Sequence, residues 1–276
     1  MIELPEACVL ARQMNETLAG KTIARVQALQ TPHGFAFFRG DAQGYAAALE
    51  GLVVAGAHSF GGRPELRFRD SRLRLSFNDG VNLRYFAPGE KLPAKHQFMM
   101  GFDDGGAVCC TVQMYGFFGI YDGEEDTLGD FYYRAGAEKP SPLSGAFDLE
   151  YFNGLRAAAG EKLSAKAFLA TEQRVPGLGN GVLQDILWRA GVHPKRKIGT
   201  LAQGEWEGLF SSVKQTLAEM TDQGGRDTEK DLFGRPGGYQ TAMSRKSPLC
   251  PGCGGPVTRM AYLGGNVYVC GACQKL

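Results

Sequence analysis

The stretch Glu172–Pro194, EQRVPGLGNGVLQDILWRAGVHP, decides how the second half of this chain is organised. Glycines at its centre precede an apolar-periodic run that predicts a helix over Gly181–Ala190. Free backbone N–H groups at the start of such a helix can hold a phosphate, and Asn180 can add its side-chain amide. The same residues also fit a plain glycine-rich turn in which Asn180 caps the helix.

Helical periodicity continues on both sides of this stretch, from about residue 148 to residue 223. Residues 137–145, AEKPSPLSG, contain two prolines and two serines and therefore predict a linker. The predicted helices are Asp148–Ala159, Ser164–Thr171, Gly181–Ala190 and Gln203–Gln223.

The first 136 residues have a different pattern. A helix is expected over residues 3–19, because Pro5 is tolerated in a first turn and Gly20 ends the periodic run. From about residue 22 to residue 134 apolar and polar residues alternate, as in LRFRD and RLRLSF, which predicts strands. Residues 78–80 and 103–106 predict hairpin turns. The fold class is therefore α+β.

Four of the seven cysteines form the pattern Cys250-x2-Cys253-x16-Cys270-x2-Cys273. This spacing is typical of a zinc ribbon, in which two tight turns each present two thiolates. Four protein ligands leave no open position for water, so the predicted ion is one structural Zn²⁺ per chain. Two disulfides are the alternative, and they fit poorly in a chain without an export signal.

Composition limits the class of protein. Hydrophobic residues make up 43% of the 276, yet no apolar run reaches the ~18–20 residues of a membrane span. The N-terminus lacks the pattern of a secretory signal, so a cytoplasmic location is expected, close to the nucleoid in a bacterium. Residues 1–160 carry a net charge of −4 and residues 161–276 a net charge of +5. This polarity suggests a polyanionic partner for the second half, although chance can also produce it.

Several segments together resemble the formamidopyrimidine-DNA glycosylase and endonuclease VIII family. The resemblance covers nearly the whole chain, in the family's order. It rests on MIELPEA at the N-terminus, EQRVPGLGNGVLQDILWRAGVHP, GGRDTEKDLFGRPGGYQ followed by CPGC and CGACQ, Lys95-His96, and PSPLSGAFDLEYF.

The resemblance implies a two-layer β-sandwich domain over residues 1–136, capped by the N-terminal helix. A linker (137–147), a helix-two-turn-helix domain (148–240) and a zinc finger (241–276) would follow. Double-stranded DNA with a lesion or an abasic site would lie in the cleft between the domains, bound by a monomer. No membrane partner is expected.

The chemistry that the resemblance implies uses the chain's own N-terminal amine. Similar enzymes flip a damaged nucleotide out of the duplex, and the amine then displaces the base and forms a Schiff base with the sugar. An α-amino group, with a pKa of ~7.7–8.0, is partly neutral at pH 7, whereas a lysine amine is not. Glu3 matches the family's proton donor and Glu6 its second glutamate. For DNA contacts the resemblance implies Gly179, Asn180 and His96.

Position 2 departs from the family, because Ile2 replaces the proline that carries the catalytic amine. If Met1 is removed, Ile2 presents a primary amine at the expected place. If Met1 stays, as the bulk of Ile2 favours, the amine moves by up to ~3.3–3.6 Å along the chain. Such a shift would disturb its alignment with the sugar unless the start of the helix rearranges.

Four functional side chains of the family are absent. The run Ser59–Leu66 lacks the family's lysine and offers only Arg63. The void-filling methionine aligns with Arg84–Ala87, the loop arginine with Met114–Gly119, and the zinc-hairpin arginine with Gly265. An aromatic residue of the 114–119 segment could replace the missing wedge. We therefore expect a glycosylase with weak or absent strand-cleaving activity. The alternatives are a catalytically inert DNA-binding member and a glycosylase for a bulky or crosslinked lesion.

Overall fold

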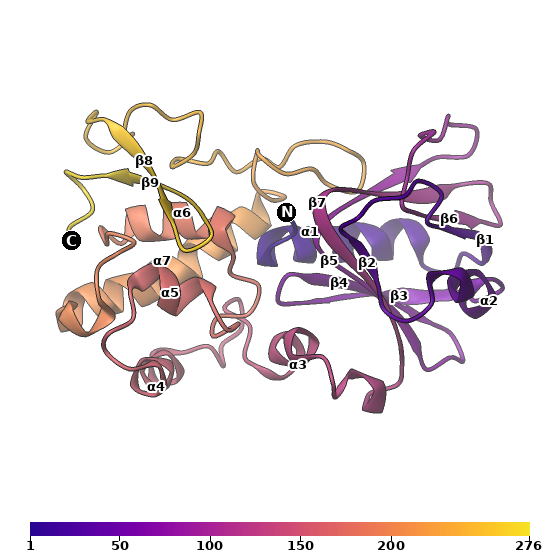
Figure 1. The fold of residues 1–276 in the computed structure, drawn as a ribbon, viewed down its shortest axis with the longest axis horizontal. Helices are drawn as coiled ribbons and strands as arrows, with labels where there is room; N and C mark the ends of the chain where they lie inside the picture. The colour runs from indigo at the N-terminus through magenta and orange to yellow at the C-terminus, as the bar shows by residue number, and fades with distance from the viewer.

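A computed structural model describes residues 1–276, with the side chain of Asp79 excepted. The strands of its large sheet gather on one side, and most of its helices lie on the other with the C-terminal hairpin. The first helix, α1 (Leu4–Leu18), begins between the two groups and runs along the sheet (Figure 1). None of the helices in the described part of the chain is long and apolar enough to cross a bilayer.

Helix α1 confirms the prediction for residues 3–19 to within one residue at each end. Glu3 is its N-cap, Pro5 lies in the first turn, and the chain leaves the helix through Gly20 at a φ of +86°. One face of the helix packs on the sheet, where Met14 and Leu18 are fully buried. Leu4 packs instead into the core of the helical domain, so α1 joins the two halves.

The N-terminal domain is one seven-stranded sheet in the order β1-β6-β7-β5-β4-β3, and β2 pairs with β7 in parallel. The other pairings are antiparallel. A short helix, α2 (Tyr45–Leu49), and two 3₁₀ turns, η1 (Ala42–Gly44) and η2 (Glu125–Thr127), interrupt the region predicted as strands. The strands are β1 (Ile23–Ala28), β2 (Ala36–Phe38), β3 (Val54–Phe60), β4 (Arg63–Phe68), β5 (Leu73–Phe86), β6 (Phe98–Phe102) and β7 (Ala107–Asp122).

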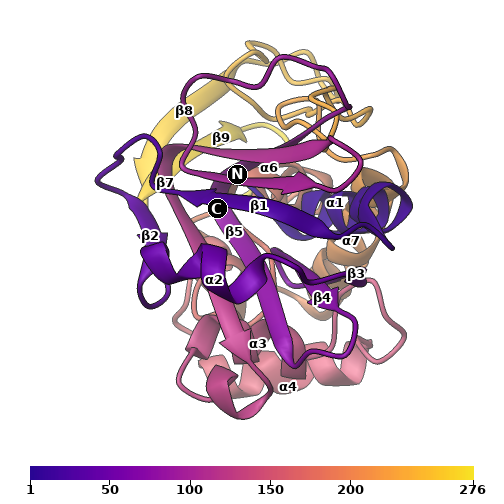
Figure 2. The same ribbon diagram turned by 90° about the vertical axis from the view of Figure 1, so that its right-hand side faces the viewer.

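The hairpin turn predicted at residues 78–80 is wrong, whereas the turn at 103–106 is confirmed between β6 and β7. Residues 78–80 lie inside β5, at a register shift against β7. Strand pairing on both sides therefore overrides the local turn preference, and the bulge bends the sheet. The bend brings its two halves face to face: the ring of Phe98 lies 6.3 Å from Phe77 and 5.6 Å from Phe118. These halves form the expected two-layer sandwich, which Figure 2 shows from the end of the molecule.

The second half contains the four predicted helices. Most of their ends differ from the prediction by one residue, and the other ends agree with it. Asp148 and Ser164 cap two of them by accepting a backbone N–H three residues on, which explains why these starts were predictable. The limits predicted for the domains stay a prediction. The helical elements are α3 (Phe131–Glu138), α4 (Leu149–Ala159), α5 (Ala165–Ala170), α6 (Asn180–Arg189), η3 (Ile198–Thr200) and α7 (Gln203–Asp222).

The C-terminal cysteines flank an antiparallel hairpin of β8 (Val257–Tyr262) and β9 (Gly265–Cys270), which packs on α6. Between α7 and this hairpin the chain crosses back to the sheet. Leu232 on that crossing is fully buried in the core of the β domain. Leu4, from the N-terminal part of the chain, thus packs in the core of the helical domain, and Leu232, from the C-terminal part, packs in the core of the β domain. These two contacts hold the domains together.

Candidate active site

A cavity of about 690 Å³ lies between the two domains. The N-terminus, the β3–β4 turn, β5, β7 and the start of α6 all contribute to its wall. The residues that matter below are Met1, Ile2, Glu3, Phe37, Arg63, Asn78, Tyr115, Phe117, Gly179, Asn180 and Gly264.

Glu3 lies on the N-terminus of α6. Its side-chain carboxylate is 3% exposed and accepts hydrogen bonds from the backbone N–H groups of Gly181 and Val182, both at 2.8 Å. A helix N-terminus stabilises a carboxylate, here one contributed by the other end of the chain. Two of the N–H groups that the sequence suggested for a phosphate are therefore already bonded to Glu3.

The glycines of this stretch are required because other parts of the chain pack too closely against them to leave room for a Cβ atom. A Cβ at Gly179 would lie 2.7 Å from Glu3 Cδ, and one at Gly181 would lie 1.6 Å from Arg226 Nη1. Gly177 has a φ of +73°, and a Cβ there would meet the backbone of Gly61 at 2.3 Å. The glycine-rich run thus lets α6 reach the N-terminus of the chain.

The two glutamates of the N-terminus have opposite pKa shifts. Burial raises the pKa of Glu3, and the nearby positive charge of Arg226 compensates only in part. Glu6 is equally buried, but the charge and hydrogen bonds of Arg226 outweigh desolvation and lower its pKa. Arg226 donates to Glu6 from Nε at 2.9 Å and from Nη2 at 2.8 Å. The two neighbouring carboxyl groups therefore differ in acidity, and Glu3 is the weaker acid of the pair.

The chain's amine belongs to Met1, and it forms an ion pair with the carboxylate of Glu229. Arg226 Nη2 donates to the Met1 carbonyl at 3.3 Å, and the Tyr115 hydroxyl lies 3.8 Å from the Met1 sulfur. The Ile2 side chain is 7% exposed, and its nitrogen is a peptide nitrogen in this chain.

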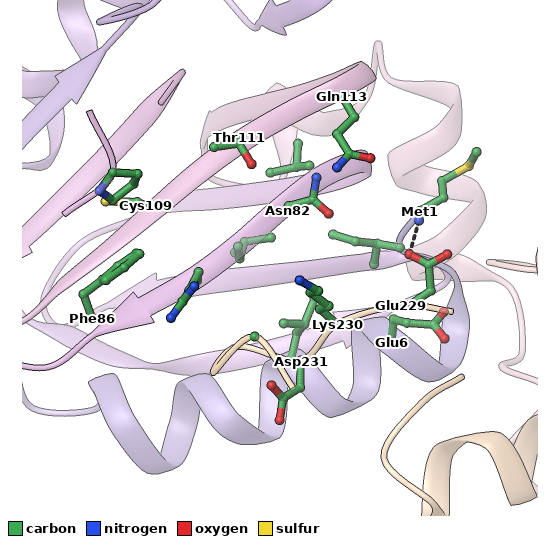
Figure 3. Close-up of a pocket in the computed structure, with 17 residues that line it drawn as sticks. Met1, Glu6, Asn82, Phe86, Cys109, Thr111, Gln113, Glu229, Lys230 and Asp231 are labelled. Atoms are coloured by element: carbon green, nitrogen blue, oxygen red, sulfur yellow. Dashed lines mark hydrogen bonds and ion pairs between the residues drawn. The ribbon is translucent and has the colours of Figure 1, made fainter. Parts of the chain in front are cut away.

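A second cavity, of about 290 Å³, opens behind Met1 between the sheet and the segment 229–234 (Figure 3). Met1 and Ile2 line both cavities, whereas Glu229, the partner of the amine, lines the inner one. Polar side chains from β5 and β7 point into the inner cavity, namely Asn82, Thr111 and Gln113.

The residues predicted to contact DNA fall in different places. Gly179 and Asn180 line the interdomain cavity, but His96 is 6% exposed and contacts the Pro93 carbonyl through Nδ1 at 3.2 Å. The Asn180 amide nitrogen donates to the Asn266 carbonyl of β9 at 3.0 Å. Its Oδ1 is buried without a hydrogen-bond partner among the described residues. Their DNA contacts stay predictions, and burial does not favour that of His96.

The positions that align with the missing family side chains lie in different cavities. Arg63 lines the interdomain cavity, with Nη1 at 3.3 Å from Ser76 Oγ. Arg84 and Phe86 line the inner cavity instead, and Asn78 is the residue of β5 that lines the interdomain one. The aligned wedge position 84–87 therefore lies away from that cavity.

Residues of the 114–119 segment differ in where they lie. Met114 is 69% exposed, whereas Phe118 is fully buried in the core. Tyr115 and Phe117 line the cavity. Phe37 of β2 joins them at 50% exposure, and the sequence analysis missed it because β2 has only three residues.

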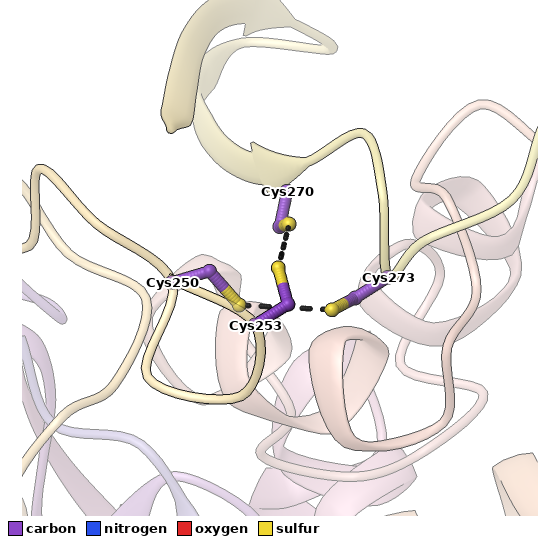
Figure 4. Close-up of side chains that lie close together, drawn as sticks. All are labelled: Cys250, Cys253, Cys270 and Cys273. Carbon is purple, nitrogen blue, oxygen red and sulfur yellow. Dashed lines mark hydrogen bonds between the residues drawn. The ribbon is translucent and has the colours of Figure 1, made fainter. Parts of the chain in front are cut away.

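The four C-terminal cysteines converge as their spacing predicts (Figure 4). Their sulfur atoms all lie within 4.8 Å of one another, with Cys250 and Cys273 3.7 Å apart and Cys253 and Cys270 3.4 Å apart. A tetrahedral ion with Zn–S bonds of ~2.3 Å requires sulfur separations of roughly this size. Trp188 Nε1 donates to Cys250 Sγ at 3.2 Å, which supplies the outer support typical of thiolate sites. This cluster could hold a metal ion.

Comparison with known proteins agrees with this geometry. The family model described as the formamidopyrimidine-DNA glycosylase H2TH domain matches residues 139–231. The formamidopyrimidine-DNA glycosylase of Cereibacter sphaeroides is 30% identical over 203 residues, 71% of each chain. That of Geotalea uraniireducens is 26% identical over 279 residues, covering 99% of this chain and all of the relative.

Solved structures share the fold. Lactococcus lactis Fpg in complex with DNA containing an abasic site superposes with a TM-score of 0.84 at 21% identity, over 99% of this chain and 100% of that one. The MutM (Fpg) protein of Thermus thermophilus gives a TM-score of 0.80 at 24% identity, over 99% and 98%. The fold and the site define the class of two-domain DNA glycosylases with a four-cysteine finger. The chain belongs to the formamidopyrimidine-DNA glycosylase and endonuclease VIII family.

Proposed function

We propose that this protein binds damaged duplex DNA in the interdomain cavity and excises a base through an N-terminal amine. The observation that carries the proposal is that Met1, which bears the N-terminal amine, and Glu3, whose pKa is raised, line one cavity. The abasic-site DNA bound by the Lactococcus lactis neighbour supports the choice of partner. A +5 charge on residues 161–276 is consistent with a polyanion.

In this proposal Glu3 donates the proton that opens the sugar ring. Its raised pKa keeps the acid form available at higher pH than for an exposed glutamate. The flipped base would enter the inner cavity, where the polar side chains of Asn82, Thr111 and Gln113 could bind its edge. Because a family lysine and the hairpin arginine are absent, we infer weak or absent strand cleavage.

A catalytically inert DNA-binding role is the second candidate. It is favoured by the ion pair that holds the Met1 amine and by the burial of Ile2, the residue that stands where the family has its proline.

We further propose that the four cysteines hold one structural Zn²⁺. Their sulfur separations fit a tetrahedral site, and four thiolates close the coordination shell. The ion would hold the β8–β9 hairpin against α6, beside Asn180.

Borohydride trapping on duplex DNA with an abasic site tests the proposal, since it reduces a Schiff base to a stable covalent complex. We expect the wild-type protein to be trapped, and Glu3→Gln to excise a lesion base about 100-fold more slowly or worse. Intact mass of the protein from its host identifies residue 1 and hence the amine. Tight binding without any trapping would instead establish the inert role.

A further inference from the structure

We infer that Glu229 is the general base that deprotonates the Met1 amine. This inference rests on the proposed function and adds a residue to it. Glu229 touches the atom that would react, which makes it a catalytic residue in that scheme.

The position of Glu229 depends on the segment that crosses from α7 back to the sheet. Arg226, at the start of this segment, binds Glu6 and the Met1 carbonyl, and Leu232, at its end, is buried in the β core. Between these two anchors, Glu229 faces the Met1 amine in the wall of the inner cavity (Figure 3).

The other carboxylates near the amine accept hydrogen bonds from other groups. Glu6 is bound by Arg226, and its pKa is lowered. Asp231 accepts from Gln13 at 3.0 Å and from Arg235 at 3.0 Å, and its pKa is lowered as well. Glu3 holds the α6 N–H groups. The remaining charged groups that face the amine or line the inner cavity are Arg84, Arg226 and Lys230.

The side chain of Glu229 has 24% exposure, so it is shielded yet within reach of solvent. An ammonium has no free lone pair and cannot attack, so it must lose a proton before the new bond forms. The Glu229 carboxylate, in contact with the amine, provides the acceptor for that proton.

On an abasic site the step balances without any further reagent. Glu229 takes one proton from the Met1 ammonium, and the neutral amine adds to the sugar aldehyde carbon. A proton moves from nitrogen to oxygen to give the carbinolamine. Glu229 then returns its proton to that hydroxyl group, which leaves as water while the nitrogen lone pair forms the C=N bond.

The test is single-turnover borohydride trapping on saturating abasic-site DNA, with wild type, Glu229→Gln, Glu229→Asp and Glu207→Gln. Glu207 lies on the exposed face of α7, so its variant makes the same charge change away from the cavity. Thermal unfolding and DNA affinity confirm that each variant is folded and binds.

At pH 7 we expect Glu229→Gln to be trapped about 100-fold more slowly, Glu229→Asp to recover much of the rate, and Glu207→Gln to match wild type. Equal or faster trapping of Glu229→Gln at pH 7 would overturn the inference while leaving the excision proposal intact. Absence of trapping in wild type would overturn both.

Discussion

Gly181 is the residue on which the two ends of the chain converge. Its backbone N–H donates to Glu3, and the space of its missing side chain is filled by the Arg226 guanidinium. Arg226 in turn neutralises Glu6, a buried carboxylate that would be costly to leave unpaired. One missing Cβ thus permits the ion pair that separates the pKa values of the two glutamates.

Gly181→Ala should destabilise the fold by about 1–3 kcal/mol, because the new methyl group overlaps the guanidinium of Arg226, which is buried and held by its hydrogen bonds to Glu6. Gly208→Ala in α7 is the matched control, since open space surrounds that position and alanine favours a helix by up to about 1 kcal/mol. Urea unfolding of both variants at pH 7 measures the difference. A stable Gly181→Ala would mean that Arg226 is not confined there.

At the scale of elements, the helices of the second half were predictable because their signals are local. Asp148 and Ser164 cap helices by bonding three residues along the chain. The turn predicted at 78–80 failed for the opposite reason. Both halves of β5 pair with β7, and many ladder hydrogen bonds outweigh the preference of three turn-forming residues. The sequence analysis did not predict helices α2 and α3. Helix α2 lies inside the region predicted as strands, and α3 spans the end of that region and the start of the predicted linker.

The β8–β9 hairpin has few buried apolar residues of its own, so we expect its stability to depend on metal. Metal analysis should give about one zinc per chain. Cys253→Ser should lower the zinc content and the thermal stability of the C-terminal part. A protein that keeps its full stability after complete metal removal by a chelator would contradict a structural ion.

At the scale of the whole molecule, the two domains that enclose the interdomain cavity are held together by two buried leucines. Each of them comes from one domain's segment of the chain and packs in the core of the other domain. Leu4 enters the helical core and Leu232 the β core. These two contacts hold the amine, Glu3 and α6 at one place. The start of α6 and the aromatic residues Phe37, Tyr115 and Phe117 of β2 and β7 then line a common cavity.

If this cavity binds a duplex, affinity should fall steeply with salt, because phosphate contacts release counterions. The logarithm of the association constant should decrease with log salt by about 0.9 for each phosphate neutralised. We expect at least a tenfold loss between 50 and 200 mM salt, measured by fluorescence anisotropy with abasic-site DNA. A flat response would exclude an electrostatic DNA partner.

The sequence by itself determined the α+β class, the order of the segments, the later helices and the convergence of the four cysteines. These follow from periodicity, caps and short spacings, which involve residues close together in the chain. Only the tertiary structure decided where the amine lies, why the pKa values of Glu3 and Glu6 diverge, and that Glu229 faces Met1. Those properties arise from contacts such as Glu3 with Gly181 and Met1 with Glu229, which are 178 and 228 residues apart in the sequence. No local pattern encodes contacts over such distances, because packing of both domains must first bring the partners together.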